Sequence, residues 1–100
     1  SRANVVASRL IASGTKPGDR VGILTRPSLD MTAAVLGVLK SGAAFVPIDA
    51  DYPAQRIAYM LEDCGAEVLL MQKGLTAPPS FTGHILFIED AVEGEAHEIQ

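Results

Sequence analysis

The stretch LKSGAAFVPIDADYPAQRIAYMLED, residues 39–63, decides the fold of this chain. A Gly-Ala-Ala run leads into an apolar strand, which ends at Pro-Ile-Asp, and a Tyr-Pro pair then stands in front of a helix. Apolar residues of that helix repeat at the i, i+3, i+4, i+7 spacing of one helical face, at Ile57, Met60, Leu61 and Cys64. The stretch therefore predicts a strand, a tight junction and an amphipathic helix in succession.

The flanking sequence repeats this alternation. Short apolar runs, typical of strands buried on both faces, occur at residues 21–25, 43–48, 67–71 and 84–88. Two more helices are predicted at residues 2–13 and 28–40, with Gly14 as the cap that ends the first and Ser28 as the cap that begins the second. Helices that cross between short apolar strands imply parallel pairing with right-handed connections. The predicted fold class is α/β, with a mainly parallel sheet of about four strands and crossover helices.

Composition excludes several classes of protein. The 100 residues are 48% hydrophobic and carry a net charge of −4, with the eight Lys and Arg scattered, which argues against a nucleic-acid surface. No apolar run approaches the ~20 residues of a membrane helix, and the first ten residues lack the features of a signal peptide. The single cysteine, Cys64, forms no disulfide framework and no thiolate metal site. We therefore expect a cytoplasmic protein without membrane or nucleic-acid partners.

Two observations predict that the domain is incomplete. The helix at residues 28–40 has few polar residues after Asp30 and is apolar around most of its circumference, so it needs burial on more than one side. The first residues also open in the middle of a helical pattern, without a start signal. We expect the chain to be part of a larger fold.

The segment SGTKPG, residues 13–18, resembles a phosphate-binding loop in composition. Such loops usually follow a strand and open a helix, so that backbone N–H groups face the anion. This segment instead leaves a helix and precedes a strand. We therefore interpret it as a helix cap at Gly14 followed by a turn at Pro17 and Gly18.

Asp49 and Asp51 lie at the end of a strand and offer a metal or phosphoryl site. A phosphoacceptor module needs a second acidic pair and a lysine after other strands, but Arg26 and Lys73 stand at those ends without an acidic pair. We favour a structural role, in which Asp49 accepts backbone N–H groups in the turn or pairs with Arg56.

The remaining chemistry-bearing residues favour simple interpretations. His84 and His97 have no partner at metal-ligand spacing. Cys64 is predicted to be a small core residue, and the acidic stretch at residues 89–98 a solvated surface segment. We predict no catalytic, cofactor-binding or metal-binding residue in this chain.

The sequence of residues 38–70, VLKSGAAFVPIDADYPAQRIAYMLEDCGAEVLL, resembles the region around the second core motif of amino-acid-activating adenylation domains of non-ribosomal peptide synthetases. The Pro-Ile-Asp and Arg-x-x-Tyr-Met-Leu pieces occur together at that family's spacing. The resemblance covers about residues 2–90 and places the chain in the adenylate-forming superfamily of acyl-CoA ligases and luciferases. Departures are mild: Ser41 replaces the usual Ala, Phe45 the usual Tyr, and Ala50 the common Pro.

The resemblance implies that residues 1–100 are a fragment of the N-terminal subdomain of a larger adenylate-forming enzyme, where they serve as scaffold and are inactive alone. Intact domains of this family use ATP and Mg²⁺ to form an aminoacyl-adenylate and then load a phosphopantetheine carrier. Their phosphate loop, substrate-binding aspartate and catalytic lysine follow this region, so Arg26, Lys40 and Arg56 should not fill those roles. The implied partners are the rest of the domain and neighbouring synthetase domains. The alternative is a free-standing small α/β module that binds a partner protein or a nucleotide.

Overall fold

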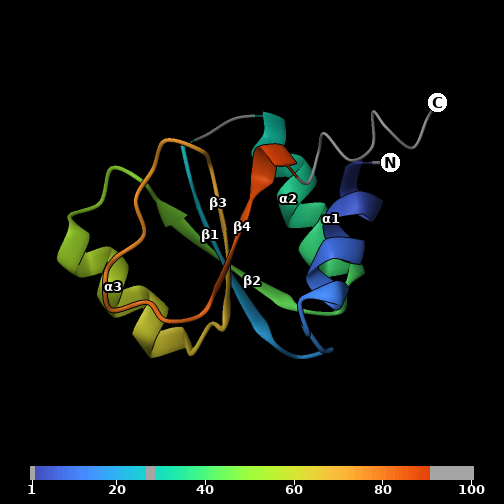
Figure 1. The fold of residues 1–100 in the computed structure, drawn as a ribbon, viewed down its shortest axis with the longest axis horizontal. Helices are drawn as coiled ribbons and strands as arrows, with labels where there is room; N and C mark the ends of the chain where they lie inside the picture. The colour runs from blue at the N-terminus through green and yellow to red at the C-terminus, as the bar shows by residue number, and fades with distance from the viewer. Residues whose placement is uncertain (1, 27–28, 91–100) are drawn as a thin grey trace.

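The computed structural model describes residues 2–26 and 29–90, with helices on both faces of a sheet (Figure 1). In chain order the elements are α1 (Arg2–Ala12), β1 (Arg20–Thr25), α2 (Leu29–Lys40), β2 (Ala44–Asp49), α3 (Ala54–Cys64), β3 (Val68–Met71) and β4 (His84–Phe87). The predicted elements are confirmed, with ends that differ by one residue. The predicted cap Ser28 lies outside the described residues.

The sheet has the strand order β2-β1-β3-β4, and all three neighbouring pairs are parallel. The predicted α/β class and parallel sheet are therefore confirmed. α2 connects β1 to β2 on one face, and α3 connects β2 to β3 on the other (Figure 1). The chain thus moves outward from β1 in both directions, which creates a topological switch point beside β1. Ligands of open α/β sheets bind at the carboxyl ends of strands beside such a point.

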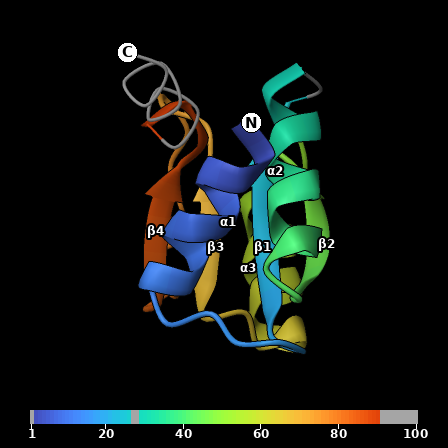
Figure 2. The same cartoon turned by 90° about the vertical axis from the view of Figure 1, so that its right-hand side faces the viewer.

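The first face of the sheet is covered by α1 and α2, which lie side by side against it (Figure 2). Gly37 of α2 is buried where α1 crosses, and a Cβ atom built on it would lie 2.4 Å from Cβ of Val6. Only a residue without a side chain permits this close approach. The buried core of this face consists of Val6, Leu10, Val21, Ile23, Ala34, Val38, Ala43, Val68, Leu70 and Ile88.

The second face is covered by α3 and by the connection at residues 72–83 (Figure 1). Ile57 and Leu61 of α3 are buried against the sheet, while Met60 and Cys64 are half-buried. The connection adds Leu75, Ala77 and Phe81 to this core. The predicted apolar face of α3 is confirmed.

The outer surface of α2 remains partly apolar. Ala34, Gly37 and Val38 are buried, whereas Leu36 is 47% exposed and Leu39 is 52% exposed. The pattern agrees with a helix that needs burial on more than one side. None of the helices within residues 2–26 and 29–90 has the length and apolar content that a membrane span requires.

Candidate functional site at the carboxyl end of the sheet

Polar residues gather where β1, β2 and β3 end, the position at which parallel sheets bind ligands. Arg26 follows β1, Asp51 follows β2, and Gln72 and Lys73 follow β3. The strand pairing brings the ends of β1 and β2 into register, because Thr25 lies opposite Asp49. This edge is therefore the candidate site on topological grounds.

The ends of β1 and β3 are linked by hydrogen bonds between the protein's own groups. The side-chain oxygen of Gln72 accepts the backbone N–H of Arg26 at 2.8 Å, and the backbone N–H of Gln72 donates to the carbonyl of Leu24 at 3.2 Å. The hydroxyl of the buried Thr25 donates to the carbonyl of Arg26 at 2.8 Å. The backbone N–H that a bound anion would need at this point is thus already used. Sequence reasoning missed Gln72, although an amide directly after a buried strand was an available signal.

Asp49 and Asp51 organise the junction between β2 and α3. A carboxylate oxygen of Asp49 accepts the backbone N–H of Asp51 at 2.8 Å, and the backbone carbonyl of Asp49 accepts the N–H of Tyr52 at 3.1 Å. This is the local bonding of an Asx turn. The predicted role of Asp49 as an acceptor in the turn is confirmed.

Asp51 lies near Arg26, with 3.5 Å between the Asp51 carboxylate and Nε of Arg26, and both side chains are largely exposed. Within the described part of the chain, no three His, Cys, Asp or Glu side chains form a group that could hold a metal ion. The acidic pair therefore offers two exposed carboxylates, one of which is held by a turn and the other by an arginine.

The alternative pairing of Asp49 with Arg56 is wrong for the described residues. The guanidinium carbon of Arg56 lies 4.1 Å from the centre of the Tyr52 ring, which is a cation–π contact. The reason is local: α3 begins at Ala54, so Arg56 stands in its first turn, next to Tyr52. Asp49, meanwhile, faces the N–H of Asp51.

The segment at residues 13–18 lies at the opposite, amino end of the sheet, between α1 and β1. Gly14 has a φ of 94°, and the N–H of Thr15 donates to the carbonyl of Leu10 at 3.0 Å, as expected for a glycine-capped helix end. The N–H of Asp19 donates to the carbonyl of Lys16 at 3.0 Å, which closes a turn around Pro17 and Gly18. The predicted cap and turn are confirmed.

The other candidate cations do not converge on one point. Nζ of Lys40 donates to Asn4 at 2.8 Å, on the α1–α2 surface. Nζ of Lys73 pairs with Asp90, and the N–H of Lys73 donates to Glu89 at 3.0 Å. His84 is exposed at the first position of β4, and His97 lies outside the described residues.

Comparison with known proteins decides the family. The model of the family described as AMP-binding enzyme matches residues 1–98. The chain belongs to the AMP-binding enzyme family. Relatives within this family include Surfactin synthase subunit 2 of Bacillus subtilis (strain 168), which is 57% identical over 89 residues, and Gramicidin S synthase 2 of Brevibacillus brevis, which is 49% identical over 89 residues. Each alignment covers 89% of this chain and 2% of the relative, so the chain spans a small part of these synthases.

Solved structures of nonribosomal peptide synthetases contain the same fold. The crystal structure of the nonribosomal peptide synthetase FmoA3 is 33% identical, with a TM-score of 0.81 over 92% of this chain and 10% of that one. A four-domain nonribosomal peptide synthetase bound to AMP and glycine is 31% identical, with a TM-score of 0.79 over 97% of this chain and 8% of that one. The resemblance to adenylation domains of non-ribosomal peptide synthetases is confirmed, and it is favoured over a free-standing module.

Proposed function

We propose that these residues form part of the N-terminal subdomain of an amino-acid-activating adenylation domain in a non-ribosomal peptide synthetase. The observation that carries this proposal is the 57% identity to Surfactin synthase subunit 2 over 89 residues. The placement is supported by a solved N-terminal subdomain of NpsA from Klebsiella oxytoca, which is 25% identical with a TM-score of 0.77 over 92% of this chain. That match covers 23% of the subdomain chain, so the segment supplies a fraction of its fold.

The reaction that we propose belongs to the intact domain. The carboxylate of an amino acid attacks the α-phosphorus of ATP, the bond to the leaving pyrophosphate breaks, and aminoacyl-AMP forms with Mg²⁺ neutralising the phosphates. The thiol of a phosphopantetheine carrier then attacks the acyl carbon, AMP leaves, and a thioester forms. No step is assigned to a side chain of the present segment.

The described residues do not fit a nucleotide by themselves. Phosphate binding requires several backbone N–H groups and a cation that converge on one point. At the carboxyl end of the sheet, the N–H of Arg26 is held by Gln72 and its side chain lies near Asp51. Electrostatic stabilisation of charge on the α-phosphate would also need a positioned cation. We therefore propose a structural contribution: the segment holds the sheet on which other parts of the domain place their reacting groups.

The partly exposed apolar residues support a role within a larger assembly. Ile11 is exposed on α1, and Leu36 and Leu39 are exposed on α2. An apolar surface of this kind usually marks an interface. We propose that the rest of the adenylation domain and neighbouring synthetase domains are the partners. We also propose that the enzyme works in the cytoplasm, since Cys64, the one cysteine of this segment, suits a reducing compartment.

Two assays test the proposal. Pyrophosphate exchange should be detected with the intact adenylation domain in the presence of ATP, Mg²⁺ and its preferred amino acid, whereas the 100-residue chain should show none with any of the twenty amino acids. Titration calorimetry of the chain with ATP and Mg²⁺ should likewise show no saturable heat. Micromolar ATP binding by the chain would overturn the structural role, and an intact domain without exchange would overturn the assignment to an amino-acid-activating enzyme.

A further inference from the structure

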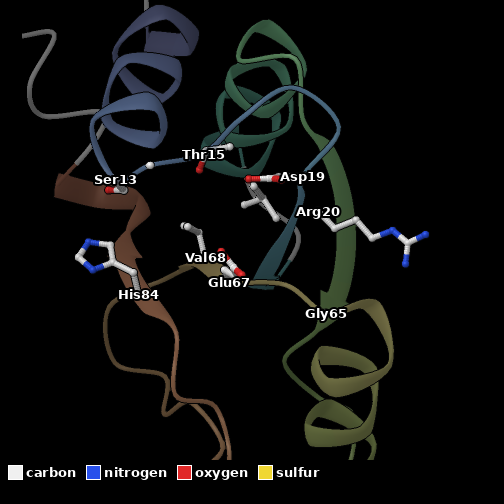
Figure 3. A pocket seen from close by; sticks show the side chains of 10 residues that line it. Ser13, Thr15, Asp19, Arg20, Gly65, Glu67, Val68 and His84 are labelled. Atoms are coloured by element: carbon white, nitrogen blue, oxygen red, sulfur yellow. The ribbon is translucent and has the colours of Figure 1, made fainter.

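The amino end of the sheet contains a hollow that no step of the proposed chemistry uses. Its volume is about 190 Å³, and it lies between the α1–β1 turn and the beginnings of β1, β3 and β4 (Figure 3). Its lining combines polar and apolar residues, among them Ser13, Thr15, Asp19, Glu67, Val21 and Val68. A hollow of this size accommodates a small polar group together with a few water molecules.

Thr15 is the residue that points to a ligand. It is only 6% exposed, yet its Oγ1 has no hydrogen-bond partner among the described residues. Its backbone N–H donates to the carbonyl of Leu10, whereas its side-chain hydroxyl lacks a partner within the described part of the chain. Figure 3 shows this oxygen directed toward the hollow. Buried polar groups in folded proteins are nearly always hydrogen-bonded, and a group that is not requires an explanation.

The charges around the hollow select the kind of ligand. Figure 3 places the carboxylates of Asp19 and Glu67 around the same space, whereas the Arg20 side chain and the His84 ring extend away from it. Nη1 of Arg20 instead lies 3.4 Å from the carbonyl of Cys64, to which it donates. One oxygen of Asp19 accepts the N–H of Lys16 at 2.9 Å, which leaves its second oxygen for a ligand. The hollow thus presents negative acceptors and a hydroxyl.

One helix end adds to this negative potential. α1 ends at Ala12, and Gly14, which follows this helix, lines the hollow. The end of α3 does not contribute in the same way, because Arg20 donates to the carbonyl of Cys64. The carboxyl end of a helix carries a partial negative charge that favours cations. A ligand that fits must therefore carry positive charge and donate hydrogen bonds.

We propose that this hollow binds a guanidinium or ammonium group, with the Thr15 hydroxyl and the carboxylates of Asp19 and Glu67 as acceptors. A metal ion is a poorer fit, because the described residues contain no group of three acidic, His or Cys side chains that could hold one. A planar guanidinium, with five N–H donors, can satisfy several acceptors at once. The group comes either from a small organic cation in solution or from an Arg or Lys side chain of another segment or protein. The inference requires only the described fold and does not rest on the proposed enzymatic function.

The test is an NMR titration of the 100-residue chain, labelled at the methyl groups of Thr15, Val21 and Val68, with N-acetyl-arginine methylamide. The matching citrulline compound, which has the same shape without the charge, is the control ligand. We expect saturable shifts of these three methyl groups with the arginine compound only. Removing one charged acceptor in Glu67→Gln should weaken binding about tenfold, as expected for a charge-assisted hydrogen bond.

Two more variants make the result specific. Thr15→Val keeps the shape of residue 15 and should weaken binding while raising the melting temperature of the ligand-free chain, because it removes a buried hydroxyl without a partner. Asp63→Asn removes an equal charge from the exposed surface of α3 and should leave binding unchanged. The proposal would be overturned if the citrulline compound caused equal shifts or if the shifts did not saturate. It would also be overturned if the affinity were unchanged in both Glu67→Gln and Thr15→Val. A bridging water would then be the occupant of the hollow.

The same titration on the intact adenylation domain distinguishes the two sources of the cationic group. It also replaces the titration of the isolated chain if that chain gives a poorly dispersed NMR spectrum. Binding to the intact domain identifies a site for a free cation. If the domain's own side chain fills the hollow, the added compound should not bind, and Glu67→Gln should lower the melting temperature of the intact domain relative to Asp63→Asn. The proposal would be contradicted if the added compound did not bind to the intact domain and the two variants had the same melting temperature. This test does not measure pyrophosphate exchange. The proposed cation site and the proposed enzymatic function can therefore fail independently of each other.

Discussion

The two faces of the sheet are covered by helices that pack in different ways. On the first face, α1 and α2 touch each other at Gly37, where an added Cβ would lie 2.4 Å from Cβ and 2.5 Å from Cγ1 of Val6. On the second face, α3 packs alone beside the connection at residues 72–83, and a Cβ built on Gly22 would lie 2.9 Å from Cδ2 at the end of the Leu61 side chain. The contact between α1 and α2 on the first face therefore depends on a particular small residue, whereas the contact of α3 with the sheet on the second face can adjust through flexible side chains.

The largest expected effect comes from Leu10→Ala compared with Leu61→Ala. Leu10 is fully buried between α1, α2 and the sheet, whereas Leu61 is 4% exposed beside the irregular connection. We expect Leu10→Ala to cost about 4 kcal/mol of unfolding free energy and Leu61→Ala about 2–3 kcal/mol, since a site that relaxes loses less. Urea unfolding of the intact domain, followed by circular dichroism, measures both. Equal losses of unfolding free energy in the two variants would contradict the expected difference between the two faces.

Gly37→Ala compared with Gly22→Ala tests the same contrast by adding a methyl group. At Gly37 the new Cβ meets Val6 and also the backbone oxygen of Ala3, at 3.0 Å. Overpacking of this kind lowers the free energy of unfolding by about 1–3 kcal/mol. We expect a loss of about 2 kcal/mol for Gly37→Ala, because the higher helix propensity of alanine offsets part of the loss. Gly22→Ala should cost less than about 1 kcal/mol, because only the ends of Leu61 and Leu69 must move. The melting temperatures of the two variants provide the measurement, and a larger loss for Gly22→Ala would reverse our interpretation.

Asp49→Ala tests whether the second face depends on its junction with β2. The variant removes the acceptor of the Asp51 N–H, and we expect a loss of about 1 kcal/mol, typical of one hydrogen bond. Asp51→Ala should cost about 0–0.5 kcal/mol, since its contact with Arg26 is exposed. Chemical denaturation of the two variants and of Asp49→Asn, which retains an acceptor oxygen, provides the test. If Asp51→Ala lost as much stability as Asp49→Ala, the contact between Asp51 and Arg26 would be as important for the junction as the hydrogen bond of Asp49.

A small effect is also expected for Arg56→Ala. Its guanidinium stacks on Tyr52 at an exposed position, so we expect a loss of about 0.5–1 kcal/mol, with the KM for ATP of the intact domain nearly unchanged. Arg56→Lys should recover part of the loss, because it keeps the charge over the ring. Loss of pyrophosphate exchange at unchanged stability would show instead that Arg56 belongs to the active site.

Much of the fold could be predicted because its signals are local. The apolar runs at residues 21–25 and 67–71 match β1 and β3, and the spacing of Ile57 and Leu61 identified the buried side of α3. The cap at Gly14 was predictable for the same reason, since a left-handed backbone at a helix end favours glycine. The partner of Arg56 was not predictable, because Asp49 and Tyr52 both lie within its reach in sequence and only the angle at which α3 begins selects between them.

The sequence by itself determined the α/β class, the order of strands and helices along the chain, and the resemblance to adenylation domains, because periodicity and motif spacing are properties of neighbouring residues. The tertiary structure decided which groups meet across long separations: Gln72 with the N–H of Arg26, and Gly37 with Val6. It also left the Thr15 hydroxyl facing a hollow without a partner. The physical reason is that a hydrogen bond, a close contact or a void depends on distances of a few ångströms between segments whose relative placement no local pattern encodes.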